Sequence, residues 1–178
     1  MRRPPFSPFI AAVLLVFGAG APSLAADPYS TGIFEPHFGV MQDELKAAAG
    51  NGKTLMIYFW QEGCPYCEKL EKNVLSSPKV RKIITESFRP VEVNIFGSRE
   101  AVDFAGAAGE EKKFAEAQKA LHTPTMVFYG KDGTEVFRLP GYWEEPHFLA
   151  ALAYVRDGKY SKSSFQEFLR YEWFKPKE

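Results

Sequence analysis

The sequence predicts an α/β domain whose mixed central sheet is covered by helices on both faces. Three apolar runs, at 55–60, 91–96 and 125–129, have the length and composition of buried strands. A segment with helical spacing of apolar residues precedes the first run, at 39–48, and others lie between the runs, at 64–75, 78–88 and 110–121. The turn Lys131-Asp132-Gly133 then folds residues 134–139 back as the antiparallel half of a hairpin. Strands joined through helices favour parallel pairing of the first three strands, and the hairpin makes the sheet mixed.

The remaining segments complete one domain without internal repeats. Residues 97–109 are rich in glycine and alanine and predict a loop or an irregular insertion. The helix that follows is expected to turn three side chains inward: Phe114, Ala117 and Leu121. A helix at 144–156 and a short helix near 163–171 close the chain.

The composition limits the function classes. The chain has 178 residues, 22 Lys and Arg against 22 Asp and Glu, and two cysteines, Cys64 and Cys67. A net charge of zero argues against a nucleic-acid or anionic-membrane partner. Two cysteines make neither a multi-disulfide scaffold nor a four-cysteine zinc site.

The first 25 residues have the pattern of a secretory signal peptide. Arg2 and Arg3 precede an apolar run at 9–17, and small residues at Ser23 and Ala25 suit cleavage after Ala25. The run is shorter than the ~20 residues of a membrane span, although an uncleaved anchor is the alternative. We therefore expect a signal peptide at 1–25, an irregular lead-in at 26–37 and a folded domain at 38–178. The expected location is a bacterial periplasm.

Cys64 and Cys67 form a C-P-Y-C motif at the predicted start of the helix after the first strand. Residues i and i+3 share one side of a helix turn, so the two sulfurs can close a disulfide. Backbone N–H groups of a first turn favour an anion, which should bring the pKa of Cys64 below the ~8.5 of a free thiol. Cys64 is then the attacking thiolate, and Cys67, one turn in and more buried, resolves the mixed disulfide. Tyr66 adds a contact surface beside the exposed sulfur.

Other roles for the pair are weaker. The additional ligands of a zinc site would have to come from scattered histidines: His37, His122 and His147. A structural disulfide across so short a loop would constrain the unfolded chain little. Haem attachment is excluded because Glu68 follows Cys67. We predict no metal, and no cofactor other than the redox-active disulfide Cys64–Cys67.

Two motifs together resemble the thioredoxin superfamily. The stretch 59–67, Phe-Trp-Gln-Glu-Gly-Cys-Pro-Tyr-Cys, is similar to its active site, and Thr123-Pro124-Thr125 is similar to its cis-proline loop. The resemblance covers about residues 38–156 and implies the thioredoxin-like fold. Within the superfamily, the chain most resembles periplasmic proteins of the SoxW type, which share an acidic residue before Gly-Cys-Pro-Tyr-Cys and a Leu-Pro-Gly-Tyr segment.

This resemblance implies site residues and partners. Cys64 corresponds to the nucleophile, Cys67 to the resolving thiol, and Pro124 to a cis-proline facing the disulfide. Thr123 would offer backbone groups to an extended client segment, and Tyr66 would contact it. An ordinary trans proline opening a strand is the alternative. The implied protein is a monomeric periplasmic thiol–disulfide oxidoreductase with no nucleic-acid partner. A membrane thiol-electron transporter would recharge it, and its clients would be protein disulfides in sulfur oxidation or cytochrome c maturation.

The sequence leaves the electron direction and the proton acceptor open. A DsbA-like thiol oxidase and a redox-sensing module that binds partners without turnover are the alternative functions. Where thioredoxin has a buried aspartate, this chain has Tyr58. Glu92 stands where thioredoxin has a lysine, so it is either a substitute proton acceptor or a solvated acid at the sheet edge. His122 either tunes Cys64 or is a capping or surface residue.

Overall fold

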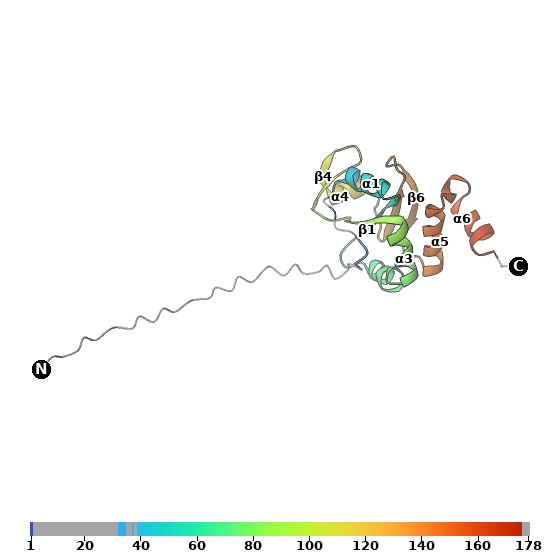
Figure 1. Ribbon diagram of the computed structural model, residues 1–178, viewed down its shortest axis with the longest axis horizontal. Coiled ribbons are helices and arrows are strands. Elements are labelled where there is room, and N and C mark those ends of the chain that lie inside the picture. Colours follow the sequence, from blue (N-terminus) through green and yellow to red (C-terminus); the bar gives the residue numbers. More distant parts are fainter. Residues whose placement is uncertain (2–31, 35–36, 38, 176–178) are drawn as a thin grey trace.

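The computed structural model describes residue 1, residues 32–34, residue 37 and residues 39–175 (Figure 1). The predicted signal peptide at 1–25 and most of the lead-in at 26–37 lie outside the described residues. Within these described ranges, no helix combines the length and the apolar character needed to cross a bilayer. The fold reported below is that of the predicted domain together with parts of its lead-in.

The elements alternate in the predicted order. They are α1 (Met41–Gly50), β1 (Thr54–Trp60), α2 (Pro65–Leu70), η1 (Glu71–Leu75), α3 (Pro78–Ser87), β2 (Phe88–Asn94), β3 (Glu100–Val102), β4 (Ala108–Glu110), α4 (Glu111–Ala117), β5 (Thr125–Tyr129), β6 (Glu135–Pro140), α5 (Glu145–Arg156), η2 (Lys159–Ser161), α6 (Phe165–Phe168) and η3 (Leu169–Trp173). Elements η1 and η3 are π-helical turns, and η2 is a 3-10 turn. The predicted strand at 125–129 and helix at 144–156 are confirmed.

The central sheet has the strand order β2-β1-β5-β6. β1 pairs parallel with β2 and antiparallel with β5, and β6 is the antiparallel partner of β5. The mixed sheet is confirmed, but the expected parallel direction of the third strand is wrong. β2 ends opposite Trp60 and β5 begins opposite Phe59, so the chain leaves β2 and enters β5 at the same end of the sheet, where β1 also ends. Because the connection between β2 and β5 starts and ends at the same end of the sheet, β5 runs antiparallel to β1.

Helices cover both faces of the sheet, as predicted (Figure 1). α3 and α5 pack against one another on one face, and α1 and α4 pack on the other. The side chains of β1 alternate between the two cores. Tyr58 and Trp60 belong to the core shared with both cysteines, whereas Ile57 and Phe59 belong to the opposite core. Because β1 is buried on both faces, it fixes the position of whatever follows Trp60.

The predicted irregular insertion at 97–109 contains a small hairpin. β3 and β4 pair antiparallel as a separate two-stranded sheet. Asp103 closes the turn, because its Oδ1 accepts the N–H groups of Ala105 and Ala107, each at 2.8 Å. Strands of three residues are too short to give a recognisable alternation of apolar side chains, which explains why the sequence predicted only a loop.

The helix predicted at 110–121 is shorter than expected, and two of its three inward residues are misassigned. Phe114 is buried, but Ala117 and Leu121 are exposed. The helix ends at Ala117 because the chain turns at Lys119, whose φ is 55°. That turn changes the direction of the side chains and buries Ala120 in place of the predicted residues.

The described part of the lead-in packs on the domain. Ile33 is buried, and the Phe34 ring stacks on Tyr58 with 5.2 Å between ring centroids. His37 Nε2 lies 2.8 Å from the Glu92 carbonyl oxygen. At Gly39 the backbone has a φ of +77° and approaches β3, and its carbonyl accepts the Val102 N–H at 2.8 Å. The lead-in therefore completes the core beside β1 and β2.

We expect Gly39→Ala to destabilise the fold strongly. A methyl group at this position would lie 2.2 Å from the Glu100 carbonyl oxygen, in addition to the cost of a positive φ. The matched control is Gly52→Ala, which has a φ of +68° and open space around the added carbon. Urea unfolding should show a loss of about 3 kcal/mol or more for Gly39→Ala and about 1 kcal/mol for the control. Equal losses would contradict this close approach.

Candidate active site

The C-P-Y-C motif lies where β1 ends and α2 begins. Gly63 turns the chain with a φ of +65°, and Cys64 follows in an extended conformation as the N-cap of α2. Pro65 occupies the first turn, where a missing N–H costs nothing and the fixed φ suits the helix. The predicted helix start is confirmed, and it places both cysteines at the end of the sheet where β1 ends.

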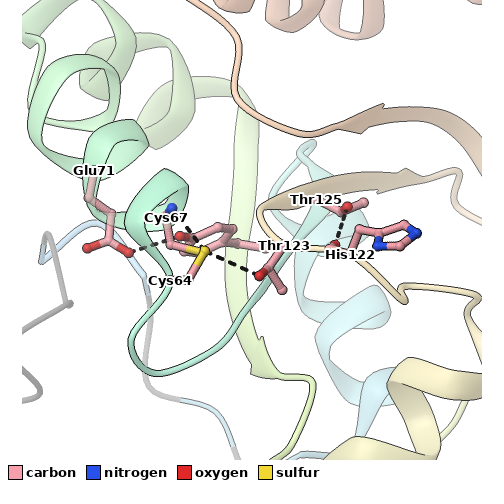
Figure 2. The surroundings of a disulfide bond; sticks show 7 residues. Cys64, Cys67, Glu71, His122, Thr123 and Thr125 are labelled. Atoms are coloured by element: carbon pink, nitrogen blue, oxygen red, sulfur yellow. Dashed lines mark hydrogen bonds between the residues drawn. A yellow bond between two sulfur atoms is a disulfide. The ribbon is translucent and has the colours of Figure 1, made fainter.

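The two cysteines form a disulfide with 5.2 Å between their Cα atoms (Figure 2). The Cys64 sulfur accepts the Cys67 backbone N–H at 3.1 Å and the Thr123 hydroxyl at 3.3 Å. Cys64 is 5% exposed and Cys67 is 0% exposed. Cys64 therefore keeps a little solvent-exposed surface, whereas Cys67 keeps none.

The loop 122–125 faces the disulfide and has the predicted form. The Thr123–Pro124 bond is cis. The sequence assigned only backbone groups of Thr123 to the site, but its hydroxyl contacts the Cys64 sulfur directly. His122 is exposed, and in Figure 2 its ring points away from the cysteines, as expected of a surface residue. Its carbonyl oxygen accepts the Thr125 hydroxyl at 2.7 Å, which braces the loop.

Three large apolar side chains are exposed in segments near this end of the sheet. Tyr66 is 61% exposed, Phe96 is 71% exposed and Leu121 is 64% exposed. Tyr66 lies between the cysteines, Phe96 follows the end of β2, and Leu121 precedes the cis-proline loop. Only Tyr66 was predicted as a contact residue. The other two are apolar residues next to predicted strands, so the sequence pattern assigned Leu121 to the interior and Phe96 to a strand.

A tyrosine and two glutamates lie on the buried side of the motif. The Tyr58 hydroxyl donates to Glu71 Oε1 at 2.9 Å, and both residues are buried. Burial first, and then the negative charge and hydrogen bond of Glu71, raise the pKa of Tyr58 far above its usual range; Glu92 adds to the effect. Glu92 is half-buried on the edge strand β2, directly opposite Tyr58. Glu71 was missed by the sequence reasoning, although its i+4 spacing from Cys67 places both on one helix face.

The three histidines do not gather at the motif. His37 lies beside β2, His122 on the cis-proline loop, and His147 on α5 against Trp143 and Phe174. Among the residues that the structure describes, no group of three or more His, Cys, Asp or Glu side chains could hold a metal ion.

An accessible sulfur bonded to a buried one is the arrangement needed for thiol–disulfide exchange. Together with the sheet order and the cis-proline loop, it defines the thioredoxin fold and supports thiol–disulfide oxidoreductase activity in general. A comparison with family models matches residues 41–156 to the thioredoxin-like domain. The chain belongs to this family.

Solved structures agree with that assignment. A thioredoxin-fold protein from Helicobacter pylori is 31% identical, with a TM-score of 0.57 over 67% of this chain and 81% of that protein. A thioredoxin from Thermus thermophilus is also 31% identical, with a TM-score of 0.52 over 64% of this chain and 81% of the thioredoxin. No curated protein sequence matched the chain. The resemblance to the SoxW type stays a prediction.

We expect the Thr123 hydroxyl to lower the pKa of Cys64 in the reduced protein. A donor stabilises the thiolate, so Thr123→Val should raise the pKa of Cys64 by about one unit. The pH dependence of Cys64 alkylation by iodoacetamide, in a Cys67→Ala background, measures the shift. Thr125→Val is the matched control, because the Thr125 hydroxyl bonds to the His122 carbonyl and not to sulfur. A shift of the same size in both variants would contradict a direct role.

Proposed function

We propose that this protein is a periplasmic thiol–disulfide oxidoreductase that reduces or exchanges disulfides in client proteins. One observation carries the proposal: the Cys64 sulfur lies at the outer end of a disulfide and accepts hydrogen bonds from the Thr123 hydroxyl and the Cys67 N–H. Both donors would stabilise negative charge on Cys64 once the disulfide is reduced. Cys64 is thus suited to be the nucleophile and the better leaving group of the pair.

The reaction with a client follows from the positions of the two sulfurs. The Cys64 thiolate attacks one client sulfur, the client disulfide breaks, and the other client sulfur leaves as a thiolate. Cys67 then loses its proton and attacks the Cys64 sulfur, which breaks the mixed disulfide and releases the second client thiolate. The client gains two electrons and the Cys64–Cys67 disulfide forms. A membrane thiol-electron transporter would return two electrons for the next cycle.

Surface chemistry supports a polypeptide client. Tyr66, Phe96 and Leu121 are exposed; Tyr66 lies within the motif, Phe96 follows the end of β2, and Leu121 precedes the cis-proline loop. Aromatic and aliphatic side chains of this kind contribute contact area to protein interfaces. Thr123 and Pro124 would present backbone groups to an extended client segment between these apolar side chains.

The cellular setting of the proposal rests on the sequence. The signal-peptide pattern at 1–25 supports export to a periplasm, where disulfides form and persist. The similarity to the SoxW type supports clients in sulfur oxidation or cytochrome c maturation. A monomer is proposed because the site needs no residue from a second copy: both sulfurs and the Thr123 hydroxyl come from one chain.

Replacing Cys67 by serine should trap clients. The variant can form the first mixed disulfide at Cys64 but cannot resolve it, so covalent adducts should accumulate in a periplasmic extract. Non-reducing electrophoresis and mass spectrometry would detect the adducts and identify the clients. Cys64→Ser, which keeps the inner sulfur and lacks the outer one, is the matched control and should trap none.

The same proteins test turnover and its direction. Wild type should reduce insulin disulfides with dithiothreitol as electron source, and both serine variants should lose that activity. A chain that traps no adduct and reduces no insulin would contradict the oxidoreductase function and favour a binding module. A reduction potential near about −120 mV, rather than the −200 to −270 mV range of reducing members, would reassign the protein as a thiol oxidase.

Phe96→Ser and Leu121→Ser should weaken the reaction with proteins and leave the reaction with small disulfides intact. Each removes apolar contact area without touching the sulfurs, so KM for a protein disulfide should rise about 5- to 30-fold with little change in kcat. Tyr171→Ser is the matched control, because Tyr171 is 62% exposed but belongs to η3. A KM change as large in Tyr171→Ser would contradict this client surface.

A further inference from the structure

Glu71 is a buried acid on the helix that carries the cysteines. It is 7% exposed, and it lies one turn after Cys67, which is 0% exposed. Its backbone N–H donates to the Cys67 carbonyl oxygen, so the helix runs from one residue to the other without interruption. Burying a carboxyl group disfavours its ionised form unless partners stabilise it. A buried acid at this position therefore needs an explanation.

The helix geometry directs Glu71 toward the inner sulfur. Residues four apart lie on one face of a helix, and helical side chains lean toward the N-terminal end. Glu71 and its preceding residue Leu70 have φ and ψ values close to −62° and −48°, so this rule holds where α2 passes into η1. Figure 2 shows Glu71 on the same side of the helix as Cys67, behind the disulfide as seen from the Thr123 loop.

Tyr58 fixes the carboxylate from the opposite side. Its hydroxyl donates to Glu71 Oε1 at 2.9 Å, and its ring lies in the core that contains both cysteines. Because burial and the charge of Glu71 keep the phenol protonated, Tyr58 stays a hydrogen-bond donor throughout the physiological pH range. A fixed donor on one carboxylate oxygen favours the charged form, and a charged carboxylate is a group that can accept a proton.

We propose that Glu71, held by Tyr58, accepts the proton of Cys67 when this cysteine resolves the mixed disulfide. The proposal rests on the proposed function, because only an exchange reaction requires the Cys67 thiolate. A thiol without exposed surface has no direct contact with solvent to take its proton, so an internal base is needed. The sequence offered Glu92 for this task. Glu71 is on the same helix face as Cys67. Glu92 lies on β2, the strand beside the one that carries Tyr58.

The proposed step conserves protons and electrons. Cys67 transfers its proton to the Glu71 carboxylate, and the resulting thiolate donates an electron pair to the Cys64 sulfur. The bond between Cys64 and the client breaks, and the client sulfur leaves with the electron pair of that bond. Glu71 then returns the proton to the departing thiolate or to water as the site opens. Glu71 contacts a reacting atom in this step, whereas Tyr58 is a positioning residue.

Few other titratable groups adjoin this site in the described structure. β1 contributes Tyr58, β2 contributes Glu92, and the lead-in contributes His37, which contacts the Glu92 backbone. α3 and α5, which also contact η1, contribute apolar side chains to this core: Val80, Ile84, Phe148 and Leu152. The pH dependence of the Cys67 step should therefore be governed by Cys67 and Glu71, with Glu92 as the competing acid.

Stopped-flow reduction of dithiobis(nitrobenzoate) separates the two steps in one trace. The first nitrobenzoate thiolate leaves when Cys64 attacks, at a rate proportional to the reagent concentration. The second leaves when Cys67 resolves the adduct, at a rate independent of that concentration. We expect Glu71→Gln to leave the first phase unchanged and to slow the second about 10- to 100-fold at pH 7. The difference should shrink at alkaline pH, where hydroxide deprotonates the thiol.

A matched variant and a second mutation keep the test decisive. Glu68→Gln removes the same charge from an exposed position of the same helix and should leave both phases unchanged. Tyr58→Phe removes the donor and should move the midpoint of the second-phase pH profile to higher pH, because the carboxylate loses stabilisation. Tyr58→Phe also carries the test alone if circular dichroism shows that Glu71→Gln does not fold.

Three results would overturn the proposal: an unchanged second phase in Glu71→Gln, equal slowing in Glu68→Gln, or slowing in Glu92→Gln with none in Glu71→Gln. For a misfolded Glu71→Gln, an unmoved pH midpoint in Tyr58→Phe overturns it. Failure of the proposed function looks different. In that case wild type itself would show no second phase or no insulin reduction, whereas failure of the present proposal alone leaves both intact.

Discussion

The pairing of β1 with its two neighbours is the constraint on which the site depends. Its side chains from Leu55 to Phe59 are almost inaccessible to solvent, and its backbone bonds to β2 on one side and β5 on the other. The end of the strand carries the turn into Cys64, and the antiparallel partner begins immediately after Pro124. Because both segments are attached to one strand pair, the Cys64 sulfur and the Thr123 hydroxyl lie 3.3 Å apart although their residues are 59 positions apart in sequence.

The site is organised by depth, and each layer has a different chemical task. Exposed apolar side chains can contact a client, Cys64 lies just beneath the surface, and Cys67 is enclosed by the core. The outer sulfur receives hydrogen bonds that favour an anion there, from Thr123 and from the Cys67 N–H. The inner sulfur lies in the same core as Tyr58, whose hydroxyl bonds to Glu71. This order makes the exchange sequential, because the client reaches one sulfur and only the protein reaches the other.

Local sequence patterns predicted the features that depend on short segments of the chain. Apolar runs located β1 and β5, Pro65 located the start of α2, and the spacing of the cysteines predicted their disulfide. The failures have non-local causes. The direction of β5 depends on where the chain re-enters the sheet, and the exposure of Leu121 depends on the turn at Lys119. The contact of Tyr58 with Glu71 joins a strand and a helix, so neither residue alone indicated it.

That contact also explains how the fold tolerates a tyrosine where thioredoxin has a buried aspartate. The phenol spans the space beneath α2 and ends at a carboxylate supplied by the helix, so an acid is retained in the interior but comes from another element. The Phe34 ring stacks on the tyrosine and shields the pair from the side of the lead-in. In lower dielectric surroundings a hydrogen bond to a charged group is stronger than in water. The lead-in therefore does more than connect segments: its packing helps to set the strength of the hydrogen bond that positions Glu71.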